Sequence, residues 1–304
     1  MGRSISVSKQ RVKKEPSLFA QVVKTGIIKS NLIPLFAGAM MALYRMDAPF
    51  SEYIYHLLFA GIGSALIIGA AGAFNNLYDA DIDAIMDRTK NRPTVTGAFS
   101  NRKVWTIAIS FTVVGAVSLY FASMLAMILG LLGLFLYIFP YTIWTKRRTI
   151  WNTEVGALSG AMPPLIGWTA ITTDVNDIGL WALFVVMVLW QMPHFYAIAV
   201  RKHDDYKAAH VPMLPVAKGM PRTYKQTQFY LILLVLSSFL FIPISYFITG
   251  LALILSLIWL YMSYTSYRKK DAYGWATVLF FYSLIHLTVL FTAIIIYTGI
   301  QLMI

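Results

Sequence analysis

An acidic cluster follows the apolar run at 53–74, and it holds four of the chain's 13 acidic residues within nine consecutive positions. Three of these and one amide recur every four residues: Asn75, Asp79, Asp83 and Asp87. If the helix continues past the apolar run, all four side chains lie on one face, where like charges repel unless cations lie against them. Amide and carboxylate oxygens are ligands that Mg²⁺ takes, together with waters and substrate phosphates. The spacing therefore predicts a magnesium site for a phosphorylated substrate.

Basic residues come directly after this stripe. Arg88 and Arg92 could hold the outer oxygens of a phosphate that the metal bridges. Lys146, at the end of a later apolar run, could meet the same phosphate or simply complement a helix dipole. A plain alternative for the whole segment is a solvated loop whose Asp and Arg side chains pair weakly.

A second acidic pair, Asp204 and Asp205, follows another apolar run and is surrounded by lysine and arginine. We expect this pair to face Asp79 and Asp83, since two metal ions on one diphosphate need carboxylates from two helices. The pair could also be a solvated loop feature, and its interest comes from the first motif.

Two histidines, His194 and His286, lie inside apolar runs, and His56 lies near the outer end of another. Ionisable residues within a membrane are functional candidates by default. His194 is the stronger candidate because it follows Pro193 on the run that leads to the second acidic pair.

Composition fixes the class of elements that must position these groups. With 58% hydrophobic residues, 12% charged residues and mean hydropathy +0.66 over 304 residues, the chain is too apolar for a soluble domain. The absence of cysteine excludes disulfides and Cys-ligated metals. The first two dozen residues lack a signal peptide's apolar core, so the first span should be an uncleaved anchor. We predict an all-α bundle with nine membrane spans: 26–44, 53–76, 104–121, 124–144, 154–173, 178–200, 229–248, 251–267 and 275–299.

Charge asymmetry predicts how the bundle is oriented. In this topology 24 of the 25 lysines and arginines fall on one side, and Arg45 alone falls on the other. By the positive-inside rule the basic N-terminal segment, 1–25, and both acidic motifs face the cytoplasm, and the C-terminus faces out. The short outer loops lie near Asp47, Ser123, Asp174 and Gly250. Membrane topology accounts for the net charge of +12, so no nucleic-acid partner is expected.

The string NNLYDADIDAIMDRTKNRP resembles the NDxxDxxxD signature of the UbiA superfamily of intramembrane prenyltransferases, with Asn76 in place of its first Asp. The strings YTIWTKRRTIWNTEVGALSGAMPPLIGW, WQMPHFYAIA and DYKAAHVPMLPVAKG resemble the branch of that superfamily that farnesylates protohaem IX. The resemblance runs from about residue 24 to the last spans. It implies a membrane domain at 26–304 in the plasma membrane, with a cavity open to the cytoplasm. It also implies farnesyl diphosphate and haem B as substrates, Mg²⁺ as cofactor, and haem O as a product for haem A synthase or a terminal oxidase.

The same resemblance implies roles for individual residues. Asn75, Asp79 and Asp83 would hold one Mg²⁺, and Asp205 with Asp204 a second. Arg88, Arg92 and Lys146 would stabilise the departing diphosphate. His194, or else His286, would contact haem iron or a propionate, and Tyr141 would line the substrate site.

The chain departs from the superfamily pattern at two points. The DxxxD motif is represented only by Asp204 and Asp205, and the YxxxK spacing is one residue longer, from Tyr141 to Lys146. Two other functions stay open: prenylation of an aromatic acid or quinone precursor, and a non-enzymatic transporter or haem-handling protein. A transporter is expected to place its binding groups near the middle of the bilayer, whereas here they gather at one face.

Overall fold

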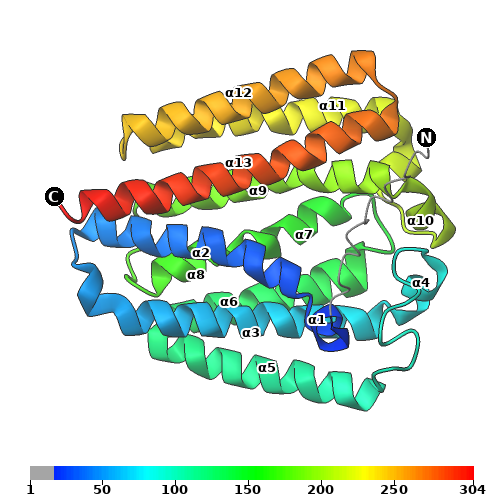
Figure 1. Cartoon of the computed structure of the whole chain (residues 1–304), viewed down its shortest axis with the longest axis horizontal. Coiled ribbons are helices and arrows are strands. Elements are labelled where there is room, and N and C mark those ends of the chain that lie inside the picture. The colour runs from blue at the N-terminus through cyan, green and yellow to red at the C-terminus, as the bar shows by residue number, and fades with distance from the viewer. Residues whose placement is uncertain (1–16) are drawn as a thin grey trace, which may run out of the picture.

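A computed structural model describes residues 17–304, and within this range the regular secondary structure consists of helices joined by loops, without strands (Figure 1). Most of the basic residues of the predicted 1–25 segment lie outside the described residues. In chain order the elements are α1 (Leu18–Val23), α2 (Thr25–Met46), the 3-10 helix η1 (Phe50–Tyr53), α3 (Ile54–Tyr78), α4 (Ala80–Ile85), α5 (Asn101–Ala122), α6 (Met124–Leu136), the π-helix η2 (Tyr137–Thr145), α7 (Asn152–Gly160), α8 (Met162–Thr169), α9 (Ile178–Arg201), α10 (His203–Ala208), α11 (Leu214–Ser237), the 3-10 helix η3 (Ser238–Phe241), α12 (Tyr246–Lys269) and α13 (Ala272–Gln301).

The long helices lie side by side, and the chain reverses direction at the two ends of the bundle (Figure 1). Helix α3 packs against α5, α2 against α8 and α13, and α9 against α11 and α13. The short helices α4 and α10 lie at one end of the bundle, and the C-terminus lies at the other. The segments that carry the two acidic motifs therefore meet at one end, as expected.

Seven helical segments of the described chain are long and apolar enough to cross a membrane. They correspond to the first four, the sixth and the last two predicted spans. The predicted span 154–173 is divided between α7 and α8, and the predicted span 229–248 covers the end of α11, η3 and the first residues of α12. The count of nine spans therefore stays a prediction, whereas the all-helical membrane architecture is confirmed.

One predicted loop was wrong. The chain turns around Pro243, between η3 and α12, and Gly250 lies within α12. Proline has no backbone N–H and disfavours helix at the residue before it, so the helix ends here. Ser245 then caps α12 by accepting a hydrogen bond from the backbone N–H of Ile248, 3.4 Å away.

Close approach of α2 and α8 depends on two glycines. A Cβ atom on Gly38 would lie 2.0 Å from the carbonyl oxygen of Pro164, and one on Gly167 would lie 1.8 Å from that of Leu35. Small residues at such crossings let helix backbones touch, which is a common way to pack helices in a membrane.

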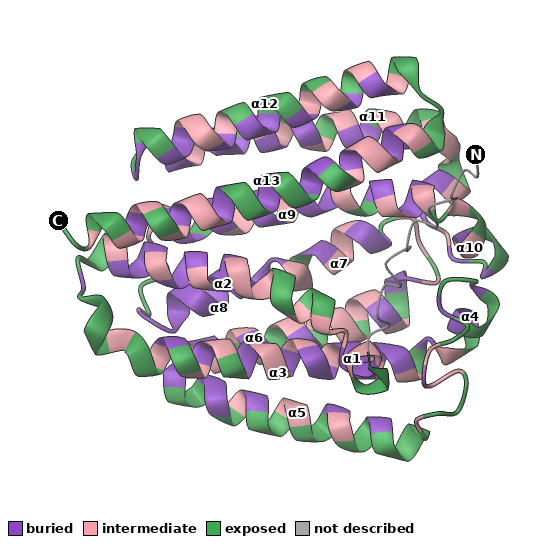
Figure 2. Cartoon of the chain, viewed as in Figure 1, coloured by how far each residue is buried: buried purple, intermediate pink, exposed green. Residues whose placement is uncertain are grey.

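Apolar side chains cover the outer surface of the bundle. On α5 the exposed residues Ile109, Val113, Val117 and Phe121 recur every four positions and form one stripe. Figure 2 shows exposed residues along the outer sides of α5 and α12 in the same way. A surface of this kind is solvated by lipid, and its backbone groups are satisfied within the helices.

Candidate active site

The acidic stripe lies where α3 gives way to α4. Helix α3 ends at Tyr78, yet the backbone N–H of Asp79 still donates to Asn75 O at 2.9 Å, and that of Asp83 donates to Asp79 O at 2.8 Å. The four-residue spacing therefore survives the break, and all three side chains are buried. The predicted continuation to Asp87 was wrong: α4 ends at Ile85, and Asp87 is exposed and pairs with Lys90.

Each buried member of the stripe has a cationic partner. Lys146 pairs with Asp79, Arg92 pairs with Asp83, and Lys24 donates to the amide oxygen of Asn75. The Asn75 amide in turn donates to Asp79 Oδ2 at 2.6 Å. The sequence predicted two of these cations and missed Lys24. This lysine is 51 residues from Asn75 in the chain, and it reaches the site because α1 and α2 pack against α3.

At the site, lysine and arginine side chains outnumber the buried aspartates. Four cations line the cavity beside the stripe: Lys24, Arg88, Arg92 and Lys146. Burial and the neighbouring Arg92 and Lys146 lower the pKa of Lys24 to about 7. A buried amine held this way is stabilised in its charged form by an added anion, so the site is suited to a multiply charged phosphate ester.

Asn76 explains the departure from the family signature. Its amide nitrogen donates to the backbone carbonyl of Val22 at 2.8 Å, and its side chain is fully buried. An aspartate at this position would place a carboxylate against a carbonyl oxygen, with no proton to share between them. Asn76 therefore holds α1 against the end of α3.

The second acidic motif meets the first through one of its two aspartates. Asp205 accepts from the backbone N–H of Asp87 at 3.0 Å, and its other oxygen lies 4.0 Å from Arg88 Nε. Asp204 is fully exposed and contacts His203. Arg88 also donates to the hydroxyl of Tyr206 at 3.2 Å, so α10 contacts the turn that follows α4.

The extra residue between Tyr141 and Lys146 is absorbed by the π-helix η2. The backbone N–H of Lys146 donates to Tyr141 O at 2.9 Å, a five-residue step in place of the four-residue step of an α-helix. Tyr141 and Lys146 therefore both line the cavity despite the longer spacing. Arg147, which follows, binds Asp81 through two contacts of 2.7 Å and lies 3.5 Å from Asp79 Oδ1. Its hydrogen bonds hold the pKa of the Asp81 carboxyl below its ordinary value.

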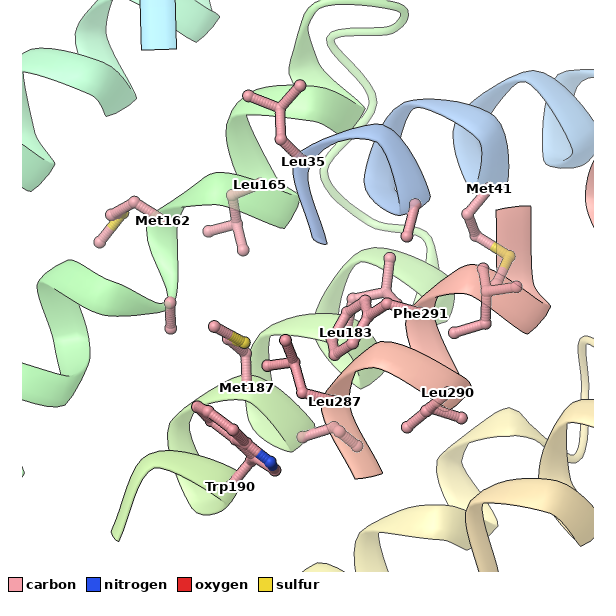
Figure 3. Close-up of a cluster of buried hydrophobic side chains, with 14 of the residues drawn as sticks. Leu35, Met41, Met162, Leu165, Leu183, Met187, Trp190, Leu287, Leu290 and Phe291 are labelled. Atoms are coloured by element: carbon pink, nitrogen blue, oxygen red, sulfur yellow. The ribbon is translucent and has the colours of Figure 1, made fainter. Parts of the chain in front are cut away.

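A cavity of about 450 Å³ extends from this charged end into the bundle. Its inner walls are mostly apolar and come from α3, α6, α8, α9 and α13. Figure 3 shows Met187 and Trp190 of α9 beside Leu287 of α13, with Met162 across from them. The arrangement, a cationic mouth over an apolar pocket, suits an amphipathic molecule with an anionic head and a hydrocarbon tail.

The two candidate histidines differ in their access to this cavity. His194 lines it, next to Trp190. His286 is 1% exposed and packs between α12 and α13, where its Nε2 lies 3.1 Å from Ser256 Oγ.

A metal at this site would be held by few protein ligands. Within residues 17–304, no three His, Cys, Asp or Glu side chains gather at metal-binding distance. Asn75, Asp79 and Asp83 nonetheless offer the hard oxygen atoms that Mg²⁺ takes, and Asp79 Oδ1 is buried without a hydrogen-bond donor. This donor set fits an ion that completes its shell with waters and substrate phosphates.

Comparison with known proteins agrees with this geometry. The UbiA prenyltransferase family model matches residues 31–285. "Protoheme IX farnesyltransferase 2" of Lysinibacillus sphaericus is 57% identical over 96% of this chain and 93% of its own length. "Protoheme IX farnesyltransferase 1" of Bacillus cytotoxicus is 55% identical over 98% of this chain and 97% of its own.

Solved structures share the fold at lower identity. A UbiA homologue from Archaeoglobus fulgidus bound to DMAPP and Mg²⁺ superposes with a TM-score of 0.75 at 16% identity, over 95% of this chain and all of that one. A homologue from Aeropyrum pernix has a TM-score of 0.65 at 18% identity, over 86% of this chain and 98% of that one. The chain is a multi-pass membrane enzyme that belongs to the UbiA prenyltransferase family.

Proposed function

We propose that this chain transfers the farnesyl group of farnesyl diphosphate to a vinyl group of protohaem IX, giving haem O and diphosphate. The observation that supports the proposal best is the cationic mouth above an apolar cavity, with Asn75 and Asp83 of the first acidic motif at its rim. The relatives that carry the name protoheme IX farnesyltransferase are 55% and 57% identical over nearly the whole chain, which favours haem as the acceptor. Residues 26–304 would form the catalytic membrane domain.

The diphosphate would lie against Lys24, Arg88, Arg92 and Lys146, whose side chains are in place before the reaction begins. Preorganised charge of this kind stabilises the negative charge that develops on the leaving group. Mg²⁺, when bound at Asn75, Asp79 and Asp83, would supply further positive charge at the diphosphate oxygens. Asp205 lies against the first motif and would support a second ion, and the exposure of Asp204 makes it the weaker ligand.

The farnesyl tail would occupy the apolar part of the cavity, between Met162, Met187 and Leu287 (Figure 3). Exclusion of water around the tail protects the allylic cation until the acceptor reaches it. Aromatic walls also suit this charge, because a cation is attracted to the face of an indole or phenol ring.

The chemistry then follows from the substrates. The bond between farnesyl C1 and its oxygen breaks, and its electron pair leaves with the diphosphate. The π electrons of the haem vinyl group form the new carbon–carbon bond to C1. Water adds to the remaining carbocation beside the porphyrin ring, and its surplus proton passes to the diphosphate or to solvent. No protein nucleophile is needed in this sequence.

The haem would lie against His194, which lines the cavity beside Trp190. His286 is too deeply packed to serve as the alternative contact. Tyr141 would line the site at its charged end, near the junction of head and tail.

The membrane setting would be the bacterial plasma membrane, with the site on the cytoplasmic face and the C-terminus outside. The positive-inside rule supports this orientation, given how strongly lysine and arginine favour one side. Haem O would then pass to haem A synthase or to a terminal oxidase within the same membrane.

The test is pigment analysis in a bacterium that lacks its own haem O synthase. Haems would be extracted from cells expressing the chain and resolved by chromatography with mass detection. We expect a farnesylated, hydrated haem that is absent from cells carrying an empty vector. If only haem B appears while the protein is present and folded, the acceptor is another molecule, and aromatic acids and quinone precursors should be screened with labelled farnesyl diphosphate.

A further inference from the structure

His194 is held in a fixed orientation on α9. Its ring is stacked between the indole of Trp190, at a centroid distance of 4.6 Å, and the ring of Phe280, at 5.4 Å. The indole N–H of Trp190 donates to the backbone carbonyl of Ser283 at 3.0 Å. His194 and Trp190 of α9 thus contact Phe280 and Ser283 of α13, and these contacts restrict rotation of the imidazole ring.

The hydroxyl of Ser283 determines which ring nitrogen of His194 carries the proton. Ser283 Oγ lies 2.6 Å from the backbone carbonyl of Phe280, which can only accept, so the hydroxyl proton lies between these two oxygens. Ser283 Oγ also lies 2.7 Å from His194 Nδ1. Because the oxygen has already donated its proton, it accepts at this second contact and Nδ1 donates.

A neutral imidazole with its proton on Nδ1 has a free lone pair on Nε2. Within the part of the chain that the structure describes, Nε2 of His194 makes no hydrogen bond, and the residue lines the cavity. We propose that Ser283 is a positioning residue that fixes this tautomer, so that His194 Nε2 binds the iron of the substrate haem. The inference rests on the proposed function and names the atom by which the enzyme would hold its acceptor.

Iron ligation would also give the cavity a means of orienting the porphyrin. Histidine that binds a metal commonly donates its other ring N–H to a neighbouring oxygen, which fixes the ring and strengthens the ligand. Ser283 provides this oxygen before any haem arrives. A fixed iron position restricts which vinyl groups can approach the allylic carbon.

The other intramembrane histidine provides an internal comparison. His286 contacts a serine hydroxyl as well, with Nε2 3.1 Å from Ser256 Oγ, but it does not line the cavity and its Nδ1 is buried without a partner. Removal of the Ser256 hydroxyl therefore changes a similar serine–histidine contact in the same membrane domain without touching the haem site.

The experiment is a haem titration of the full-length purified protein in detergent, followed by absorption and resonance Raman spectroscopy. We expect wild type to bind haem B with an imidazole nitrogen as axial ligand. H194G should lose this ligand signature and regain it when free imidazole is added. S283A should bind haem about 2- to 10-fold more weakly, the loss expected for one neutral hydrogen bond, while S256A should match wild type.

Two results with the variants would overturn the inference. The first is an unchanged axial-ligand spectrum in H194G, and the second is equal haem affinity in S283A and S256A. Thermal unfolding of each variant shows whether a loss of haem binding comes from misfolding. Imidazole rescue of H194G tests iron ligation independently, and it remains valid if S283A fails to fold. A wild-type protein that produces farnesylated haem with no imidazole ligand would reject this inference and leave the proposed function standing. Failure to bind haem at all would reject both.

Discussion

At the scale of single residues, Asp79 is the most tightly constrained group in the site. Its carboxylate is fully buried, pairs with Lys146 and accepts a hydrogen bond from Asn75 at 2.6 Å. We expect D79A to lower farnesyl transfer by at least about 100-fold, because loss of one fixed charge at a reaction centre has effects of this order. The measurement is the rate of farnesylated haem formation in membranes that contain equal amounts of folded protein.

Asp81 offers the matched control, since it lies two residues away in the first turn of α4, the helix that Asp79 precedes. Its side chain is 64% exposed and contacts Arg147 at the surface. D81A removes the same chemical group outside the cavity, and we expect activity within about threefold of wild type, as for other exposed ion pairs. Full activity in D79A would reject the metal assignment, and equal loss in both variants would indicate a structural cause.

Residue patterns in the sequence were sufficient to find the acidic stripe and three of the four cations of the cavity mouth. They could not find Lys24, because nothing in its local sequence distinguishes it from the other basic residues near the N-terminus. Its place beside Asn75 follows from the docking of α1, which depends on the buried contact between Asn76 and Val22. Contacts between segments far apart in the chain are the part that a single sequence does not contain.

At the scale of elements, the π-helix η2 explains how an inserted residue can be tolerated. In an α-helix each residue adds about 100° of rotation, so one insertion would turn Lys146 away from Asp79. The wider turn of η2 accommodates the extra residue, and Lys146 keeps its contact. Counting this segment as an α-helix therefore predicts that Lys146 points away from Asp79, whereas in the structure the two residues pair.

Deletion of Trp144 tests this account. The side chain is 61% exposed, so its removal costs little packing, and we expect η2 to become an α-helix that still directs the lysine at Asp79. Farnesyl transfer should stay within about 100-fold of wild type, the scale of a misplacement of one group by about 1 Å. Deletion of Phe135, which is 50% exposed in the α-helical part of the same span, should abolish activity because it shifts the register there. Loss of activity in both deletions would contradict the account.

The crossing of α2 and α8 gives a second test at this scale. We expect G167A to destabilise the protein by about 1–3 kcal/mol, because the new methyl group overlaps the Leu35 carbonyl oxygen and backbone cannot move aside as a side chain can. The matched control is G250A, since a Cβ at Gly250 meets nothing within 4 Å. Detergent thermal-shift assays compare the two, and equal melting temperatures would show that the helices separate easily.

Helix existence was the most predictable feature of the fold, and helix ends were the least. Apolar length predicted the spans because a membrane helix must satisfy its own backbone. The break at Asp79 and the turn at Pro243 depend on local competition between helix continuation and side-chain contacts. Hydropathy alone does not resolve that competition, which is why the predicted loop at Gly250 was displaced.

At the scale of the whole molecule, charge separates the two ends of the bundle. The end with α4 and α10 carries the four cations of the cavity mouth and both acidic motifs (Figure 1). At the opposite end, Arg45 is paired with Asp177 at 2.8 Å, so the one lysine or arginine that residues 17–304 place there is neutralised by a neighbour. Under the proposed function the asymmetry would serve two purposes, since the charges that orient the protein in the membrane would also bind the diphosphate.

This dual role leads to a topological prediction that does not depend on activity. The native chain has no cysteine, so single-cysteine variants can be labelled without background. Asn176 and Asp204 are both exposed and lie at opposite ends of α9, because Asn176 precedes this helix and Asp204 belongs to α10, which follows it. We expect a membrane-impermeant maleimide to label N176C in intact spheroplasts and D204C only after the membrane is opened, because 24 of the 25 basic residues favour the cytoplasmic side at the D204C end. The reverse pattern would place the diphosphate site outside the cell, away from the cytoplasmic supply of prenyl diphosphate that the proposed reaction requires.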